Sequence, residues 1–202
     1  MKGLKVFAAG LLLRAGCRCA LPALTFLEQV RAKINASQPF RADFVQQVMI
    51  DGEINLEESG FIVFADSTRM KWQYLRPDFK TFILENGRYQ FFERENNQVL
   101  KGRIDPRNEQ LIWDLLCSPR PGQSSRWDER TRTILLSVED GSGRQELKIN
   151  IAADLLPERV EQTSASEVTN VYLFKNFRTG IVLADGEFAL DLPEGVEIIE
   201  TE

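Results

Sequence analysis

The chain has 202 residues, with 30 acidic side chains, 25 basic side chains, three cysteines and no histidine. The absence of histidine excludes a Ser-His-Asp triad, a Cys-His pair, an imidazole general base and a histidine-ligated zinc site. Hydrophobic residues make up 43% of the chain, enough for one domain with a sizeable core, and the negative net charge argues against a nucleic-acid partner. Composition therefore favours a binding or carrier protein over an enzyme.

Residues 1–23 have the layout of a secretory signal segment. Lys2 and Lys5 precede a short apolar run over residues 6–13, and small residues follow it. This run is too short to span a bilayer. We therefore expect residues 24–202 to form a single exported domain, which carries 21 basic and 30 acidic side chains and a net charge of −9.

The end of the signal segment allows two interpretations. Arg14-Ala15-Gly16-Cys17 is similar to the bacterial lipobox, in which cleavage leaves a lipid-modified N-terminal cysteine, but Arg14 occupies the aliphatic position of that motif. Lipidation of Cys17 would anchor the protein to a membrane. A cut near Ala20 or Ala23 would release a protein without a lipid anchor, and we favour this second interpretation.

The first element of the exported domain is predicted to be helical. Apolar residues recur every three or four positions between Leu24 and Ile34, which is the spacing of an amphipathic helix. We expect a helix over residues 24–36, with Arg31 and Lys33 turned outward.

From Phe40 onward the hydrophobic period changes to two, which is typical of a β-strand. Asp51-Gly52, Asn86-Gly87 and Asn96-Asn97 are dipeptides that close tight hairpins. Further strands are predicted between these turns, at residues 60–65, 70–75, 79–84, 89–94 and 98–101.

A second helix is predicted over residues 108–117, because Leu111, Ile112 and Leu115 share one helical face. Cys117 lies in this apolar stretch, so we expect a buried thiol. A loop rich in Pro, Gly and Ser follows through Ser125. Strands are then predicted at residues 133–138, 145–151, 159–163, 168–177, 180–183 and 187–192.

About ten or more strands joined mostly by hairpins predict a mainly β fold with one strongly curved antiparallel sheet, closed or half closed, and the two helices can lie over its concave face as a lid. The concave face would then hold an apolar pocket. Several strands carry large apolar residues at both parities, as in Phe61-Ile62. A sheet covered on both faces gives the same pattern, so pocket lining and ordinary core both remain open.

An ordered set of short segments resembles the outer-membrane lipoprotein carrier family, LolA. The segments are Phe44-Val45-Gln46-Gln47, Ser59-Gly60-Phe61, Met70-Lys71-Trp72-Gln73-Tyr74, Pro77-Asp78, Asn86-Gly87, the helix at 108–117, the strand at 147–151 and Leu192-Pro193-Glu194-Gly195-Val196. Together they span essentially all of the chain after residue 23.

The resemblance implies an incomplete, half-open β-barrel covered by a lid of α-helices. It also implies a monomeric periplasmic carrier without a cofactor or a catalytic role. Such a carrier shelters the acyl chains of bacterial lipoproteins in its apolar interior. It takes them from an inner-membrane ABC-type releasing complex and passes them to an outer-membrane lipoprotein acceptor.

The resemblance also suggests site residues. The predicted acyl-chain cavity comprises Phe44, Phe61, Val63, Met70, Trp72, Tyr74, Ile83 and Phe91, and the predicted lid comprises Leu111, Ile112 and Leu115. The family usually has a lid-latching arginine where this chain has Asp66, and often a docking aromatic where it has Met70. Thr68 and Arg69 are candidate substitutes for the latch.

Three alternatives come from other classes of protein. The first is a lipid-anchored outer-membrane lipoprotein acceptor, or a lipoprotein-binding sensor, on the same fold with Cys17 lipidated. The second is a carboxylate enzyme that uses Glu57-Glu58, or Glu93 with Glu95, although we expect these side chains to be solvated. The third is a structural module without lipid cargo.

Overall fold

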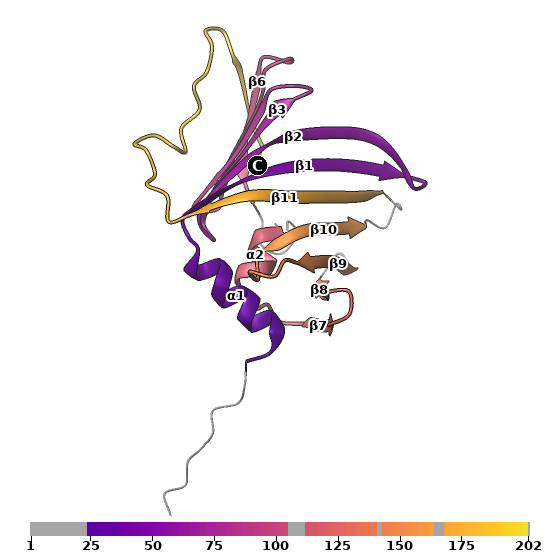
Figure 1. Cartoon of the computed structure of the whole chain (residues 1–202). Coiled ribbons are helices and arrows are strands. Elements are labelled where there is room, and N and C mark those ends of the chain that lie inside the picture. The colour runs from indigo at the N-terminus through magenta and orange to yellow at the C-terminus, as the bar shows by residue number, and fades with distance from the viewer. Residues whose placement is uncertain (1–23, 105–111, 141–142, 164–167, 202) are drawn as a thin grey trace, which may run out of the picture.

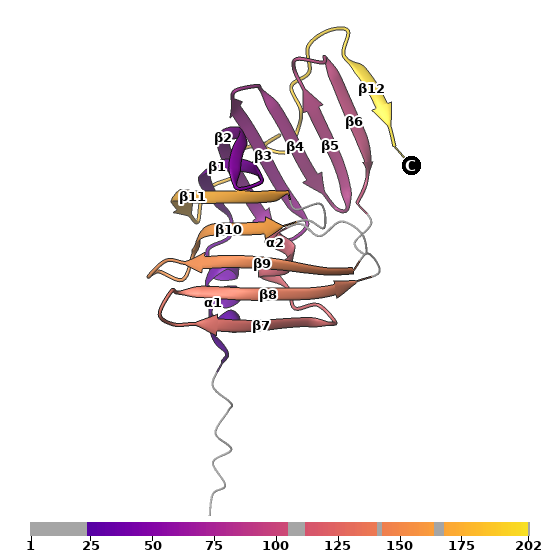
Figure 2. The ribbon, with the colours of Figure 1, turned by 90° about the vertical axis from the view of Figure 1, so that its right-hand side faces the viewer.

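The computed structural model describes residues 24–104, 112–140, 143–163 and 168–201. In this part of the chain, twelve strands form one sheet in the order β12-β6-β5-β4-β3-β2-β1-β11-β10-β9-β8-β7. The sheet is strongly curved, and α1 and α2 lie inside its curve (Figure 1). Its two edges, β12 and β7, lie at opposite ends of the strand order, so the sheet is open (Figure 2). The predicted mainly β, half-open fold is confirmed.

The strands are β1 Phe40–Ile50, β2 Glu53–Asp66, β3 Arg69–Arg76, β4 Lys80–Glu85, β5 Arg88–Glu93, β6 Gln98–Arg103, β7 Gln123–Asp128, β8 Thr133–Asp140, β9 Gly143–Ile151, β10 Pro157–Thr163, β11 Thr169–Thr179 and β12 Glu197–Glu200. Asp51-Gly52 and Asn86-Gly87 have positive φ at both positions and close the β1–β2 and β4–β5 hairpins, as predicted.

Helix α1 spans Phe26–Ala36 and begins with a capping box. The Thr25 hydroxyl accepts a hydrogen bond from the Glu28 amide at 3.3 Å, and the Glu28 carboxylate accepts one from the Thr25 amide at 2.6 Å. The helix buries Leu27, Val30 and Ile34 against the concave side of the sheet. The apolar spacing in the sequence therefore located this helix within two residues of its start.

The two faces of the sheet follow from strand register, because residues paired across antiparallel strands point to the same side. Phe40 pairs with Phe64 and Ala42 pairs with Ile62. All four side chains are fully buried and belong to the core that also contains the helices. They define the concave face, and their sequence neighbours on each strand point to the convex face.

The convex face of β2–β6 carries a second buried layer, formed by Val63, Ile83, Phe92 and Val99. Residues 180–196 run along this side of the sheet (Figure 1). Lys71, which pairs with both Val63 and Ile83, binds the backbone carbonyl of Glu187 at 2.8 Å and also its carboxylate. The apolar residues at both parities thus reflect a sheet covered on both faces.

Three details differ from the predicted elements. Residues 180–183 and 187–192 are not strands: alternate side chains of 187–192 are half-buried because the segment packs on the convex face without joining the ladder. Strand β7 begins at Gln123, inside the predicted loop. Strand β12 was not predicted, and it pairs in parallel with β6.

Within the described residues, the helices are too short or too polar to cross a membrane.

Gly60 provides a test of this register. A Cβ atom at Gly60 would lie 1.8 Å from the Gln73 carbonyl oxygen on β3, a backbone atom that the sheet holds in place. We expect Gly60→Ala to lower the free energy of unfolding by about 3 kcal/mol, measured by urea denaturation of a chain beginning at residue 24.

Gly87→Ala is the matched control. A Cβ there meets open space, and its cost comes from the positive φ of 74°, which amounts to about 1 kcal/mol. A Gly60→Ala variant no less stable than Gly87→Ala would contradict the described β2–β3 register.

Candidate functional site

A cavity of about 260 Å³ lies between α2 (Ile112–Cys117) and the concave face of the sheet. Its lining comes from β3, β4, β10, β11 and α2, and consists of Trp72, Tyr74, Phe82, Ile112, Trp113, Gln162 and Tyr172. Ligand pockets usually hold about 300–1,000 Å³, so the space left beside α2 is small.

An aromatic wall forms one side of this cavity. Trp72 and Tyr74 alternate along β3 and so project to the same face. Phe44 packs edge-on against both, with ring centroids 4.9 Å from Trp72 and 5.1 Å from Tyr74. Tyr172 lies 5.6 Å from Trp72 across the cavity wall. The wall is therefore a rigid apolar surface with hydroxyl groups at one end.

Five of the eight predicted cavity residues share the concave face. Trp72 and Tyr74 line the cavity, Phe44 and Met70 are buried in the adjoining core, and Phe91 pairs with Phe82 on the same face.

The prediction is wrong for Phe61, Val63 and Ile83, which point to the convex face. Each is offset by one residue from a concave neighbour, and a one-residue offset in a strand reverses the side. The Phe61 ring instead lies beneath the Arg41 guanidinium, 3.5 Å from its carbon.

Four lining residues were not predicted: Phe82, Trp113, Gln162 and Tyr172. Phe82 could have been found from the sequence, because it is the residue opposite Trp72 when the hairpin between β3 and β4 is closed. The others depend on contacts between segments far apart in the chain.

Helix α2 packs on the concave face through Trp113. The Trp113 side chain is fully buried, and its ring centroid lies 5.2 Å from Phe40, 5.6 Å from Phe64 and 5.2 Å from Phe174. Of the predicted lid residues, Ile112 lines the cavity, Leu115 is buried in the core, and Leu111 lies outside the described residues. Helix α2 therefore occupies the concave face as a plug.

Arg31 on α1 fastens the C-terminal end of α2. Its guanidinium donates hydrogen bonds to the carbonyl oxygens of Leu115 at 3.2 Å and Ser118 at 3.3 Å, and to the Gln123 side chain. Asn35 on α1 adds a hydrogen bond to the Cys117 carbonyl at 3.4 Å. The prediction that Arg31 points outward is wrong, because the last turn of α2 presents carbonyl groups that need donors.

The comparisons with known proteins agree with this architecture. The outer-membrane lipoprotein carrier protein of Helicobacter hepaticus is 23% identical over 163 residues, which cover 81% of this chain and 84% of the relative. The crystal structure of a LolA superfamily protein from Nitrosomonas europaea matches with a TM-score of 0.52 at 10% identity, over 84% of this chain and 99% of that one. The chain is LolA-like.

A second crystal structure shares the fold of this LolA-like chain. An uncharacterized conserved protein from Thermus thermophilus has a TM-score of 0.54 at 14% identity, over 86% of this chain and 98% of that one. No protein-family model matches the sequence.

Asp66 is held within its own turn in this LolA-like chain. Its carboxylate accepts hydrogen bonds from the Thr68 amide at 2.9 Å, the Thr68 hydroxyl at 2.6 Å and the Arg69 guanidinium at 2.9 Å. Burial opposes ionisation, but these bonds outweigh it and lower the pKa of Asp66. The position stabilises the β2–β3 turn, while Arg31 makes the contacts to α2. The candidate lipidation residue, Cys17, lies outside the described residues.

The candidate catalytic carboxylates do not form a pair. Gln46 pairs with Glu58 and Gln47 with Glu57, so the two glutamates point to opposite faces. Glu58 is buried rather than solvated, and its carboxylate is 2.9 Å from the Lys80 ammonium. Glu95 is exposed, and Glu93 accepts a hydrogen bond from Asn96 at 3.0 Å.

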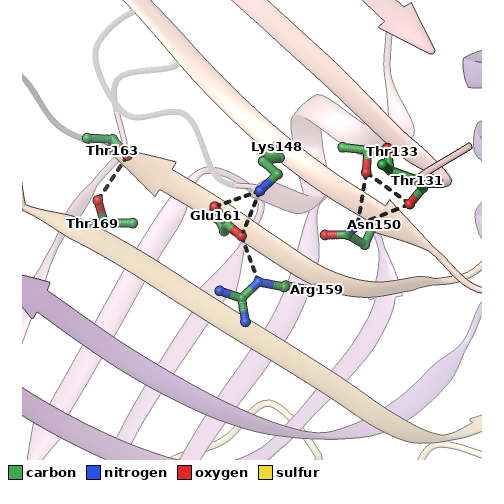
Figure 3. Close-up of polar contacts among 8 residues, drawn as sticks. All are labelled: Thr131, Thr133, Lys148, Asn150, Arg159, Glu161, Thr163 and Thr169. Carbon is green, nitrogen blue, oxygen red and sulfur yellow. Dashed lines mark hydrogen bonds and ion pairs between the residues drawn. The ribbon is translucent and has the colours of Figure 1, made fainter. Parts of the chain in front are cut away.

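The convex side of β7–β10 has a polar depression of about 590 Å³, bordered by Glu161. There Glu161 accepts bonds from Arg159 at 2.7 Å and Lys148 at 3.3 Å (Figure 3). Burial would raise the pKa of Glu161, but these cations outweigh it and lower that pKa. A carboxylate held ionised in this way cannot act as a general acid near neutral pH.

Cys117, at the end of α2, is buried as predicted. Burial raises the pKa of its thiol to about 12, so almost no thiolate forms at neutral pH. The thiol therefore reports whether α2 is seated on the sheet, and in a chain beginning at residue 24 it is the single cysteine.

We expect native Cys117 to resist an aromatic disulfide reagent at pH 8, and Arg31→Met to raise its modification rate about tenfold by removing the hydrogen bonds that hold α2. Absorbance of the released thiolate measures the rate. Lys33→Met, on the same helix, serves as the control and should leave the rate unchanged. Equal rates in the two variants would show that Arg31 does not hold α2.

Proposed function

We propose that this LolA-like chain is a lipoprotein carrier that buries acyl chains between α2 and the concave face of its sheet. The observation that supports it most directly is the seating of α2: apolar side chains of a six-residue helix fill an aromatic-walled face and leave a cavity of about 260 Å³ beside them. An acyl chain that displaces α2 would be buried against the face that α2 now covers.

The energetics of acyl burial favour such an arrangement. Burying one acyl chain of ordinary length gains on the order of 10 kcal/mol at about 0.8 kcal/mol per methylene, and several chains would exceed the practical limit of affinity. A carrier that binds this tightly could not release its cargo. Displacing α2 opposes binding, because it exposes Trp113, Leu115 and Leu116, at a cost of about 1.5–3 kcal/mol for each side chain.

Two buried donors, one on α2 and one on α1, lack hydrogen-bond partners in the described part of the chain while α2 is seated on the sheet. Among the described residues, Trp113 Nε1 and Arg31 Nε are buried donors without a hydrogen-bond partner. Each such donor costs roughly 1–3 kcal/mol when water is excluded from it. This cost makes the empty, plugged state less stable, so cargo needs less free energy to displace α2.

The proposed route follows from the signal-like N-terminus and from the carrier relative. The exported chain acts as a monomer in the periplasm, without a cofactor or a chemical step. It receives lipoproteins from an inner-membrane ABC-type releasing complex and delivers them to an outer-membrane lipoprotein acceptor.

The experiment that tests this function is release of a radiolabelled lipoprotein from membranes that carry an ABC-type releasing complex. The chain beginning at residue 24 should release lipoprotein into the soluble fraction as a complex. Trp72→Glu should reduce release at least about tenfold, because a charge in the aromatic wall opposes burial of an acyl chain.

The matched control is Phe61→Glu, an aromatic-to-glutamate change on the convex face next to the Arg41 guanidinium. It should release lipoprotein as the unchanged chain does. Absence of release by the unchanged chain, or an equal loss in both variants, would rule out the proposed cavity.

Bound lipoprotein should also unseat α2. We expect the complex to expose Cys117, so that its modification rate at pH 8 rises at least about tenfold above that of the empty chain. A complex in which Cys117 stays as protected as in the empty chain would show that cargo binds elsewhere.

A further inference from the structure

A row of polar side chains crosses the concave face where the aromatic wall ends. Its members come from five strands and are Gln46, Glu58, Tyr74, Lys80 and Tyr172. Gln46 pairs with both Glu58 and Tyr172, and Tyr74 pairs with Lys80, so all five project to the same side. Tyr74 and Tyr172 also line the cavity, which places the row at its border.

Hydrogen bonds within the row do not involve the Tyr172 hydroxyl. The Tyr74 hydroxyl donates to the Gln46 side chain at 3.0 Å, and the Lys80 ammonium donates to the buried Glu58 carboxylate at 2.9 Å. The Tyr172 hydroxyl makes no hydrogen bond to any residue in the described part of the chain. Gln162, two residues along β10 from the partner of Tyr172, also lines the cavity; its amide donates one hydrogen bond to the Gln145 side chain at 3.5 Å and keeps a second N–H.

The charges around the row disfavour an anion. Glu58 pairs with Lys80 at short range, and Asp78 and Glu93 lie close enough to act on the same ammonium, so Lys80 offers an incoming anion no unpaired positive charge. Burial and the charge of Glu58 raise the pKa of Tyr172 to about 12. Its hydroxyl is therefore a neutral donor near neutral pH.

We infer that the polar row binds the uncharged ester or amide carbonyl that links an acyl chain to its carrier molecule, and that it rejects acyl chains with an anionic head. The inference rests on the proposed acyl-binding function. The Tyr172 hydroxyl and the Gln162 amide donate to the carbonyl oxygen, and the tail extends along Trp72 and Phe82. A carboxylate or phosphate there would lose its hydration and lie near the buried Glu58 carboxylate, whose charge repels it.

The experiment compares four single-chain ligands at pH 9, by displacement of a neutral fluorescent probe from the chain beginning at residue 24. Monopalmitoylglycerol presents the ester, N-palmitoylglycinamide presents the amide, and palmitate and palmitoyl-lysophosphatidylglycerol present anionic heads. We expect both neutral ligands to bind at least about tenfold more tightly than both anions. The ester and amide arms show which linkage the row prefers.

Glu58→Gln tests the charge argument, because it leaves Lys80 without its buried counter-ion. We expect palmitate affinity to rise about tenfold while monopalmitoylglycerol affinity changes little. Glu57→Gln is the matched control: its side chain points to the convex face, where the native carboxylate accepts a hydrogen bond from Gln47 at 2.8 Å. It should leave both affinities unchanged.

Tyr172→Phe removes the proposed donor without breaking a hydrogen bond to a described residue. If circular dichroism shows that Glu58→Gln does not fold, this variant alone tests whether the polar row binds the carbonyl. It should weaken both neutral ligands at least about threefold. The control is Tyr89→Phe, which removes a hydroxyl that lies 2.7 Å from that of Thr201. It should leave the affinity for both neutral ligands unchanged.

Equal affinities for palmitate and the neutral ligands, or unchanged neutral-ligand affinity in Tyr172→Phe, would overturn the inference and leave the carrier function standing. Failure of all four ligands to bind would count against acyl binding, and therefore against the proposed function itself.

Discussion

Burial of Trp113 against Phe40, Phe64 and Phe174 is the contact on which the rest of the structure depends. It seats a helix too short to be stable alone, and it joins β1, β2 and β11 into one core. The same contact occupies the surface that an acyl chain would need. Stability of the empty protein and affinity for cargo therefore compete for one area of the sheet.

The sheet separates two tasks by the alternation of its strands. Concave side chains meet the helices and border the cavity, whereas residues 180–196 run along the convex side of β2–β6, where Glu187 binds Lys71. Phe61, Val63 and Ile83 are as apolar as Trp72, yet their parity assigns them to the other layer. A substitution on one face can thus test function while its neighbour on the other face serves as the control.

Local signals in the sequence predicted the local structure well. The apolar spacing between Leu24 and Ile34, the hairpin dipeptides at Asp51-Gly52 and Asn86-Gly87, and the change of period at Phe40 all mark real elements. Local patterns could not show which parity faces the helices, because both faces are covered. They also missed the parallel β12–β6 pair and the bond from Arg31 to Leu115, which joins residues 84 positions apart.

The segment at 180–196 has a mechanical consequence. It leaves β11 near the middle of the sheet and returns at the β6 edge, where β12 adds four residues in parallel. Along the way Ile181 bonds to the Pro39 carbonyl at 3.2 Å and Glu187 binds Lys71. The chain thereby acts as a brace across the back of β2–β6. A sheet braced in this way keeps its curvature. Space for an acyl chain is therefore made by moving α2 and not by flattening the sheet.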